Sequence, residues 1–161
     1  KTVLMNVRDV RSGHGKVFGM SYGGDVTPEE CWEMLGGDAG ALIVDVRTRP
    51  EWSFVGVPEL GGNMSEIVLQ EWQVFPAMQV DENFAASLES EIIRRGGDKN
   101  TKLCFLCRSG VRSLAAAKTM TELGYPNTYN ISGGFEGGLD DHGHRGAREG
   151  WKAAGLPWRQ K

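Results

Sequence analysis

The spacing of apolar and polar residues predicts strands that alternate with helices along the chain. The segments ALIVDVR (41–47) and KLCFLC (102–107) are short, nearly continuous apolar runs, which are typical of strands covered on both faces. Two further strands are predicted, one within residues 65–72 and one that begins near residue 127. The alternation predicts an open α/β fold, with a parallel sheet of about five strands and helices on both faces.

Local signals place helices between these strands. A first helix should begin after Thr27, a capping residue that is followed by Pro28 at a favourable first position. A second helix should be capped by Asp81 and end at the glycine pair 96–97, and a third is predicted within 112–125.

Two shorter segments are also assigned. Residues 49–56 are predicted to form a turn or a single helical turn, and residues 147–158 one short helix that packs Trp151 and Trp158 onto the body. The first twenty residues carry no clear pattern.

Composition and charge restrict the class of protein. The 161 residues are 40% hydrophobic and 24% charged, as in ordinary globular domains, and the net charge of −3 argues against a general nucleic-acid or membrane-surface binder. The longest apolar runs are too short to span a membrane, and no signal-like segment opens the chain. Three cysteines do not suggest a disulfide framework, so we expect a cytoplasmic protein.

Polar residues follow two of the predicted strands. Asp45 and Arg47 lie at the end of one strand, and Cys107 lies at the end of another. In open α/β sheets, ligands bind beyond the carboxyl ends of the strands. We therefore expect these side chains to meet at one edge of the sheet.

The turn CRSGVR (107–112) is suited to stabilising a thiolate. If it curls around the sulfur, the free N–H groups of the following helix, together with Arg108 and Arg112, favour the ionised form of Cys107. Gly110 offers a positive φ at the tightest point, and Ser113 can cap the helix. A core cysteine has no use for two arginines, so the pattern indicates a nucleophile activated without a histidine base.

The motifs resemble the rhodanese (thiosulfate sulfurtransferase) family. CRSGVRS after KLCFL, LIVDVRTRPEW upstream and ISGGF downstream are similar to its active-site loop and flanking blocks. We expect a single rhodanese domain over residues 1–161, with a core at about 22–135 and extensions at 1–21 and 136–161. The segment FVGVPELGGNMSEIVLQEW stands where the family usually has Gly-His-Ile-Pro-Gly-Ala.

The resemblance implies sulfur transfer through a persulfide on Cys107, with no cofactor and no metal. Its partners would be a small anionic donor such as thiosulfate and an acceptor, either cyanide in vitro or a small or protein thiol. Arg108 or Arg112 would hold the donor's oxygens, and Asp45 and Arg47 would support the loop. The donor-binding loop would comprise Arg108, Ser109, Gly110, Val111 and Arg112, with Ser113 in support.

Two alternatives remain open. Phosphatases and arsenate reductases of the same fold place five residues between the cysteine and the arginine, whereas only four separate Cys107 from Arg112. The smaller ring fits one sulfur atom better than a phosphate. A non-catalytic regulatory module is the second alternative, although inactive family members usually lack the cysteine.

Other candidates have simpler interpretations. Cys104 and Cys107 have the Cys-x-x-Cys spacing of a redox dithiol, but Cys104 lies inside a predicted strand and should point into the core. Cys31 is expected to be an ordinary packing residue. The cluster that includes His142 and His144 could bind a metal, but an exposed turn is the preferred interpretation, and His14 has no supporting context.

Overall fold

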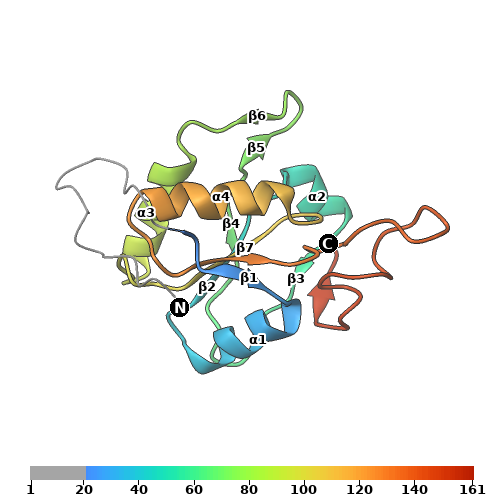
Figure 1. The fold of residues 1–161 in the computed structure, drawn as a ribbon, viewed down its shortest axis with the longest axis horizontal. Coiled ribbons are helices and arrows are strands. Elements are labelled where there is room, and N and C mark those ends of the chain that lie inside the picture. The colour runs from blue at the N-terminus through green and yellow to red at the C-terminus, as the bar shows by residue number, and fades with distance from the viewer. Residues whose placement is uncertain (1–20) are drawn as a thin grey trace, which may run out of the picture.

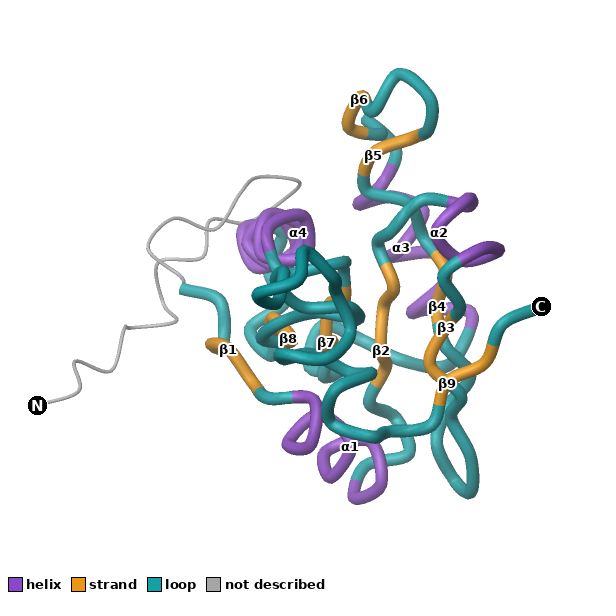
Figure 2. Tube along the Cα trace, turned by 90° about the vertical axis from the view of Figure 1, so that its right-hand side faces the viewer, coloured by secondary structure: helices purple, strands orange, loops and turns teal. Residues whose placement is uncertain are grey.

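The computed structural model describes residues 21–161, so His14 and nearly all of the predicted N-terminal extension lie outside the described residues. Five parallel strands form the central sheet in the order β1-β8-β7-β2-β4, as Figure 2 shows. The predicted α/β sheet is therefore confirmed. The strands are β1 (Gly24–Val26), β2 (Leu42–Asp45), β4 (Val68–Leu69), β7 (Leu103–Leu106) and β8 (Thr128–Ile131).

Helices cover both faces of this sheet (Figure 2). The helices α3 (Phe84–Arg94) and α4 (Val111–Glu122) pack on one face, and α1 (Pro28–Gly37) packs on the other. Side chains alternate along a strand, so Leu103 and Phe105 of β7 enter the first core while Cys104 enters the second. The apolar runs are continuous because each strand must supply both cores.

The predicted start of α1 is confirmed. Thr27 Oγ1 accepts a hydrogen bond from the Glu30 backbone N–H at 3.1 Å, and the Glu30 carboxylate accepts one from the Thr27 N–H at 3.2 Å. The start of α3 differs from the prediction, because its N-terminal cap is Asn83. Asp81 instead accepts the Asn83 N–H two residues further on, at 2.9 Å, and this local turn keeps Asp81 outside the helix.

Short elements surround the central sheet. The helix α2 (Arg49–Phe54) follows β2, and the hairpin of β5 (Gln73–Val74) and β6 (Gln79–Val80) extends from the body in Figures 1 and 2. The strands β3 (Val57–Pro58) and β9 (Trp158–Arg159) form a second two-stranded sheet. The strand expected within 65–72 shrinks to the two residues of β4.

The predicted helix at 147–158 is wrong. This segment forms turns and ends in β9, because Gly150 and Gly155 take φ values of 98° and 74° that interrupt a right-handed helix. Trp151 is fully buried, as expected. Trp158 is 38% exposed and packs edge-on against Phe135.

The strand β1 was not predicted from the sequence. Its three residues, GDV, offer only one apolar side chain, so they carry no strand pattern of their own. Pairing with β8 makes them a strand. Within residues 21–161, none of the helices has the length and apolar character needed to cross a membrane.

Candidate active site

The pairing of β2 with β7 creates the edge of the sheet where the predicted residues meet. Asp45 is in register with Leu106, and the Val46 N–H donates to the Leu106 carbonyl at 2.8 Å. Arg47 and Cys107 therefore emerge from adjacent strands at the same carboxyl edge. The predicted placement of Asp45, Arg47 and Cys107 at one edge of the sheet is confirmed.

Residues 107–112, here called the cysteine loop, curl around the Cys107 sulfur. The Gly110 N–H donates to Sγ at 3.1 Å, and Gly110 has the predicted positive φ, 119°, at the N-terminal cap of α4. The sulfur thus lies at the positive end of the helix dipole. Both features favour negative charge on that atom.

Ser113 does not cap α4 as the sequence suggested. Its Oγ lies 3.1 Å from the Cys107 sulfur and donates to Asn130 Oδ1 at 2.6 Å. The Asn130 amide donates in turn to the Gly110 carbonyl at 3.3 Å. Gly110 already serves as the cap, so the buried hydroxyl turns inward. Its single proton goes to Asn130, so toward the Cys107 sulfur the Ser113 oxygen acts as an acceptor from the thiol.

Asn130 was missed by the sequence reasoning. It is nearly buried near the end of β8 and also donates to Asp25 Oδ1 at 3.3 Å. The available signal was a polar residue within a short, otherwise largely apolar strand, TYNI. Such a signal indicates a hydrogen-bonding role without naming the partner.

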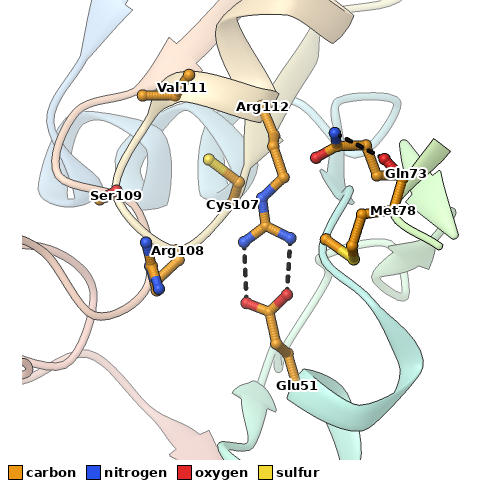
Figure 3. Close-up of a pocket in the computed structure, with 8 residues that line it drawn as sticks. All are labelled: Glu51, Gln73, Met78, Cys107, Arg108, Ser109, Val111 and Arg112. Carbon is orange, nitrogen blue, oxygen red and sulfur yellow. Dashed lines mark hydrogen bonds and ion pairs between the residues drawn. The ribbon is translucent and has the colours of Figure 1, made fainter. Parts of the chain in front are cut away.

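Arg112 forms a bidentate ion pair with Glu51 of α2 (Figure 3). The two nitrogen–oxygen distances are 2.7 and 2.9 Å. Glu51 also accepts hydrogen bonds from the Thr48 N–H at 3.2 Å and the Thr48 hydroxyl at 3.0 Å. Burial opposes ionisation of Glu51, but the hydrogen bonds and charge of Arg112 outweigh it and hold the pKa of this carboxyl below its usual value.

A pocket of about 430 Å³ opens over the sulfur. Arg108 is exposed and contributes to its wall, and the hairpin of β5 and β6 contributes Gln73 and Met78. Most of the predicted loop residues line the pocket, while Gly110 acts through its backbone. The lining residues, drawn in Figure 3, are Glu51, Gln73, Met78, Cys107, Arg108, Ser109, Val111 and Arg112.

Asp45 and Arg47 form a second arginine–carboxylate pair, and both side chains are fully buried. The Arg47 Nε donates to Asp45 Oδ1 at 2.9 Å, and Nη2 donates to the Gly56 carbonyl at 2.8 Å. The guanidinium also lies 4.2 Å from the centre of the Phe135 ring. The pair therefore contacts the segment that contains Phe135, and its Asp45 carboxylate also interacts electrostatically with Arg112 of the cysteine loop.

The segment Gly133–Phe135 supports the cysteine loop directly. The Phe135 N–H donates to the Cys107 carbonyl at 2.8 Å. A Cβ on Gly134 would lie 2.4 Å from that carbonyl oxygen, and Gly134 has a φ of 62°. Only glycine allows this close approach.

Cys31 and Cys104 lie in the core on the other face of the sheet, and both are fully buried. The hydrogen bond with Cys104, together with burial, raises the pKa of Cys31. Because Cys104 and Cys107 point to opposite faces, they do not form a redox pair. Cys31 and Cys104 are therefore packing residues, as predicted.

The histidines near residue 140 form an exposed turn, as preferred from the sequence. Asp140 Oδ1 accepts the backbone N–H groups of His142 and His144, each at 2.9 Å. Across residues 21–161, no three side chains of metal-ligating type come together.

The fold and the cysteine loop define a rhodanese-like protein, and comparison with known proteins agrees. The family profile described as "Rhodanese-like domain" matches residues 27–141. The chain also shares 37% identity over 134 residues, 83% of this chain and 95% of the relative, with an uncharacterized protein of Rickettsia conorii. The chain belongs to the rhodanese-like family.

The chain is also similar to two further proteins. The crystal structure of Rv0390 from M. tuberculosis has a TM-score of 0.76 and 48% identity, covering 88% of this chain and 100% of that one. Thiosulfate sulfurtransferase GlpE of Haemophilus influenzae is 28% identical over 113 residues, 70% of this chain and 85% of that protein.

Proposed function

We propose that this protein is a sulfurtransferase that moves sulfane sulfur from thiosulfate or a related donor to a thiophilic acceptor through a persulfide on Cys107. The observation that carries the proposal is the environment of the Cys107 sulfur, which receives the Gly110 N–H and contacts Ser113 at the start of α4. The family and its named thiosulfate sulfurtransferase relative support the same chemistry.

In the first step, the Cys107 thiolate attacks the outer sulfur of the donor. The bond between the two donor sulfurs breaks, its electron pair leaves with sulfite, and a persulfide anion remains on Cys107. In the second step, an acceptor such as cyanide or a thiolate attacks the terminal sulfur, and the Cys107 thiolate is restored. The Gly110 N–H and the α4 dipole favour negative charge at both stages.

The loop favours sulfur transfer over phosphoryl transfer. A phosphate needs a wide ring of donors and a free arginine, whereas the ring between Cys107 and Arg112 contains four residues and Arg112 is engaged by Glu51.

The net charge of −3 supports partners other than nucleic acid or membrane. Three free cysteines support a location in the reducing cytoplasm.

Mass spectrometry after exposure to thiosulfate tests the proposal. The protein should gain the mass of one sulfur atom at Cys107 and lose it again on addition of cyanide, with release of thiocyanate. Cys107→Ser should gain no sulfur and keep an unchanged circular dichroism spectrum, and Cys104→Ser is the matched control that retains transfer. Phosphatase activity without sulfur uptake, or full transfer by Cys107→Ser, would rule out the proposal.

A further inference from the structure

Glu51 introduces a negative charge into a pocket that the proposed function requires to receive an anion. Glu51 and Cys107 both line this pocket, and the Glu51 side chain is 20% exposed. The Cys107 sulfur already accepts the Gly110 N–H at the start of α4, so stabilising negative charge on the sulfur does not depend on the Glu51 carboxylate. The carboxylate therefore affects the charge that the pocket presents to a donor.

The bidentate pair removes Arg112 from the set of free anion-binding groups. Two of its N–H groups point at Glu51 at 2.7 and 2.9 Å, and the charges of the two side chains cancel. In Figure 3 this pair lies between Arg108 and Met78, and Arg108 stands apart from it. Among residues 21–161, no carboxylate forms an ion pair with Arg108, so the wall offers one unneutralised guanidinium.

The remaining wall includes apolar side chains. Val111 is 78% exposed and Met78 is 38% exposed, and both line the pocket. A small inorganic dianion has no apolar surface to bury against these side chains, whereas an organic group attached to the donor can pack against them. The pocket thus combines one net cation with an apolar surface.

We propose that Glu51 is a charge-selecting residue that favours organic sulfur donors with one negative charge over the thiosulfate dianion. This proposal rests on the proposed function and names its substrate class. The representative donor is an alkanethiosulfonate, R–SO₂–S⁻. The Cys107 thiolate attacks its terminal sulfur, the sulfur–sulfur bond breaks, and a sulfinate, R–SO₂⁻, leaves with the electron pair.

Alkylation of Cys107 tests the charge effect without any sulfur transfer. Iodoacetate and iodoacetamide react with the same thiolate, but iodoacetate carries one negative charge. The ratio of the two rates therefore reports the potential in the pocket and cancels any change in the amount of thiolate. Glu51→Gln should raise the iodoacetate-to-iodoacetamide ratio about fivefold, the scale for one unit charge at short range with salt screening.

The donor preference should shift by a similar factor. Thiosulfate and methanethiosulfonate differ by one negative charge, and both yield the same persulfide. In Glu51→Gln the ratio of kcat/KM for thiosulfate to kcat/KM for methanethiosulfonate should rise about fivefold. Glu91→Gln is the matched control, because Glu91 also bonds arginines but does not line the pocket, and its two ratios should match the wild type.

The possible outcomes separate the two proposals. Unchanged ratios in Glu51→Gln would overturn the charge-selecting role, whatever the activity. A raised alkylation ratio with no sulfur transfer from either donor would overturn the proposed function while the effect of Glu51 on charge stands. Glu51→Ala removes the same charge and replaces Glu51→Gln if that variant does not fold, with the same expected shifts.

Discussion

Two arginine–carboxylate pairs lie at the same edge of the sheet, and they differ in burial. The Asp45–Arg47 pair is fully buried, and its two residues lie two positions apart at the end of β2. The Glu51–Arg112 pair joins α2 to α4, faces the pocket, and its side chains are 20% and 15% exposed. Breaking a buried pair leaves a charge without water or partner, whereas a pair at the pocket wall can exchange its partner for solvent or a ligand.

This contrast divides the work of the site. The buried pair fixes the position of Phe135 and Gly56 and thereby the scaffold beneath the cysteine loop. The pocket pair sets the charge that an approaching molecule meets. Similar chemical groups thus serve stability in one place and selectivity in the other, and burial accounts for the difference.

The largest effect is expected from breaking the buried pair. Arg47→Ala should lower the free energy of unfolding by about 3–5 kcal/mol, because Asp45 becomes an unpaired buried charge. Urea denaturation measures this change. Arg49→Ala is the control: Arg49 is 83% exposed and its bridge to Glu71 is 3.7 Å long, so about 0.5 kcal/mol or less is expected. If the two variants lost similar amounts of unfolding free energy, burial would not account for the difference between the ion pairs.

Gly134 tests how the buried pair reaches the cysteine loop. Gly134→Ala should displace the Cys107 carbonyl, lower the free energy of unfolding by about 2–3 kcal/mol and reduce sulfur transfer. Gly143→Ala is a matched control, since Gly143 also has a positive φ, 76°, but a Cβ there meets no atom within 4 Å. It should show only the backbone cost of about 1 kcal/mol and full activity. Full activity in Gly134→Ala would exclude this link.

The pocket pair should affect activity more than stability. Arg112→Ala should reduce kcat/KM for the donor about tenfold or more, because it leaves the Glu51 carboxylate unpaired in the pocket that receives the anionic donor. The free energy of unfolding should fall by only about 1 kcal/mol. Steady-state kinetics and urea denaturation separate the two quantities. An unchanged kcat/KM would show that Arg112 has no role in the reaction with the donor.

The smallest effect is the pH dependence of the pocket pair. Arg112 holds the pKa of Glu51 below its usual value, so the pair stabilises the folded protein above the unfolded-state pKa of about 4.3. This contribution should be lost as the pH falls through the lower folded-state pKa. Because the pair is partly solvated, the change should be about 1 kcal/mol or less.

Unfolding of the wild type and of Glu51→Gln over a pH series measures this dependence. The difference in unfolding free energy between the two proteins should shrink as the solution becomes acidic. A difference that grows on acidification would contradict the sign of the Glu51 shift.

Much of the fold was predictable because its signals are local. The apolar runs of β2 and β7 and the cap at Thr27 depend on periodicity and on neighbours within one turn. The strand β1 and the tail were not predictable in this way. The strand forms through pairing with β8, and the tail contains glycines whose left-handed conformations no apolar pattern reveals.

The site shows the same division. The turn at Gly110 next to Cys107 was evident, because the thiol, the glycine and the helix that follows are adjacent in the chain. Glu51 was visible as part of a motif, but its pairing with Arg112 was not. The inward turn of Ser113 toward Asn130 was likewise not visible.

By itself, the sequence determined the succession of strands and helices and the turn of the cysteine loop at Gly110, since these depend on residues close together in the chain. Only the tertiary structure decided that Glu51 forms an ion pair with Arg112 and that Asn130 accepts a hydrogen bond from Ser113. It also decided that Gly134 lies against the Cys107 carbonyl. Such contacts join side chains from separate elements. Their partners are fixed by strand register and helix packing, which the local pattern does not encode.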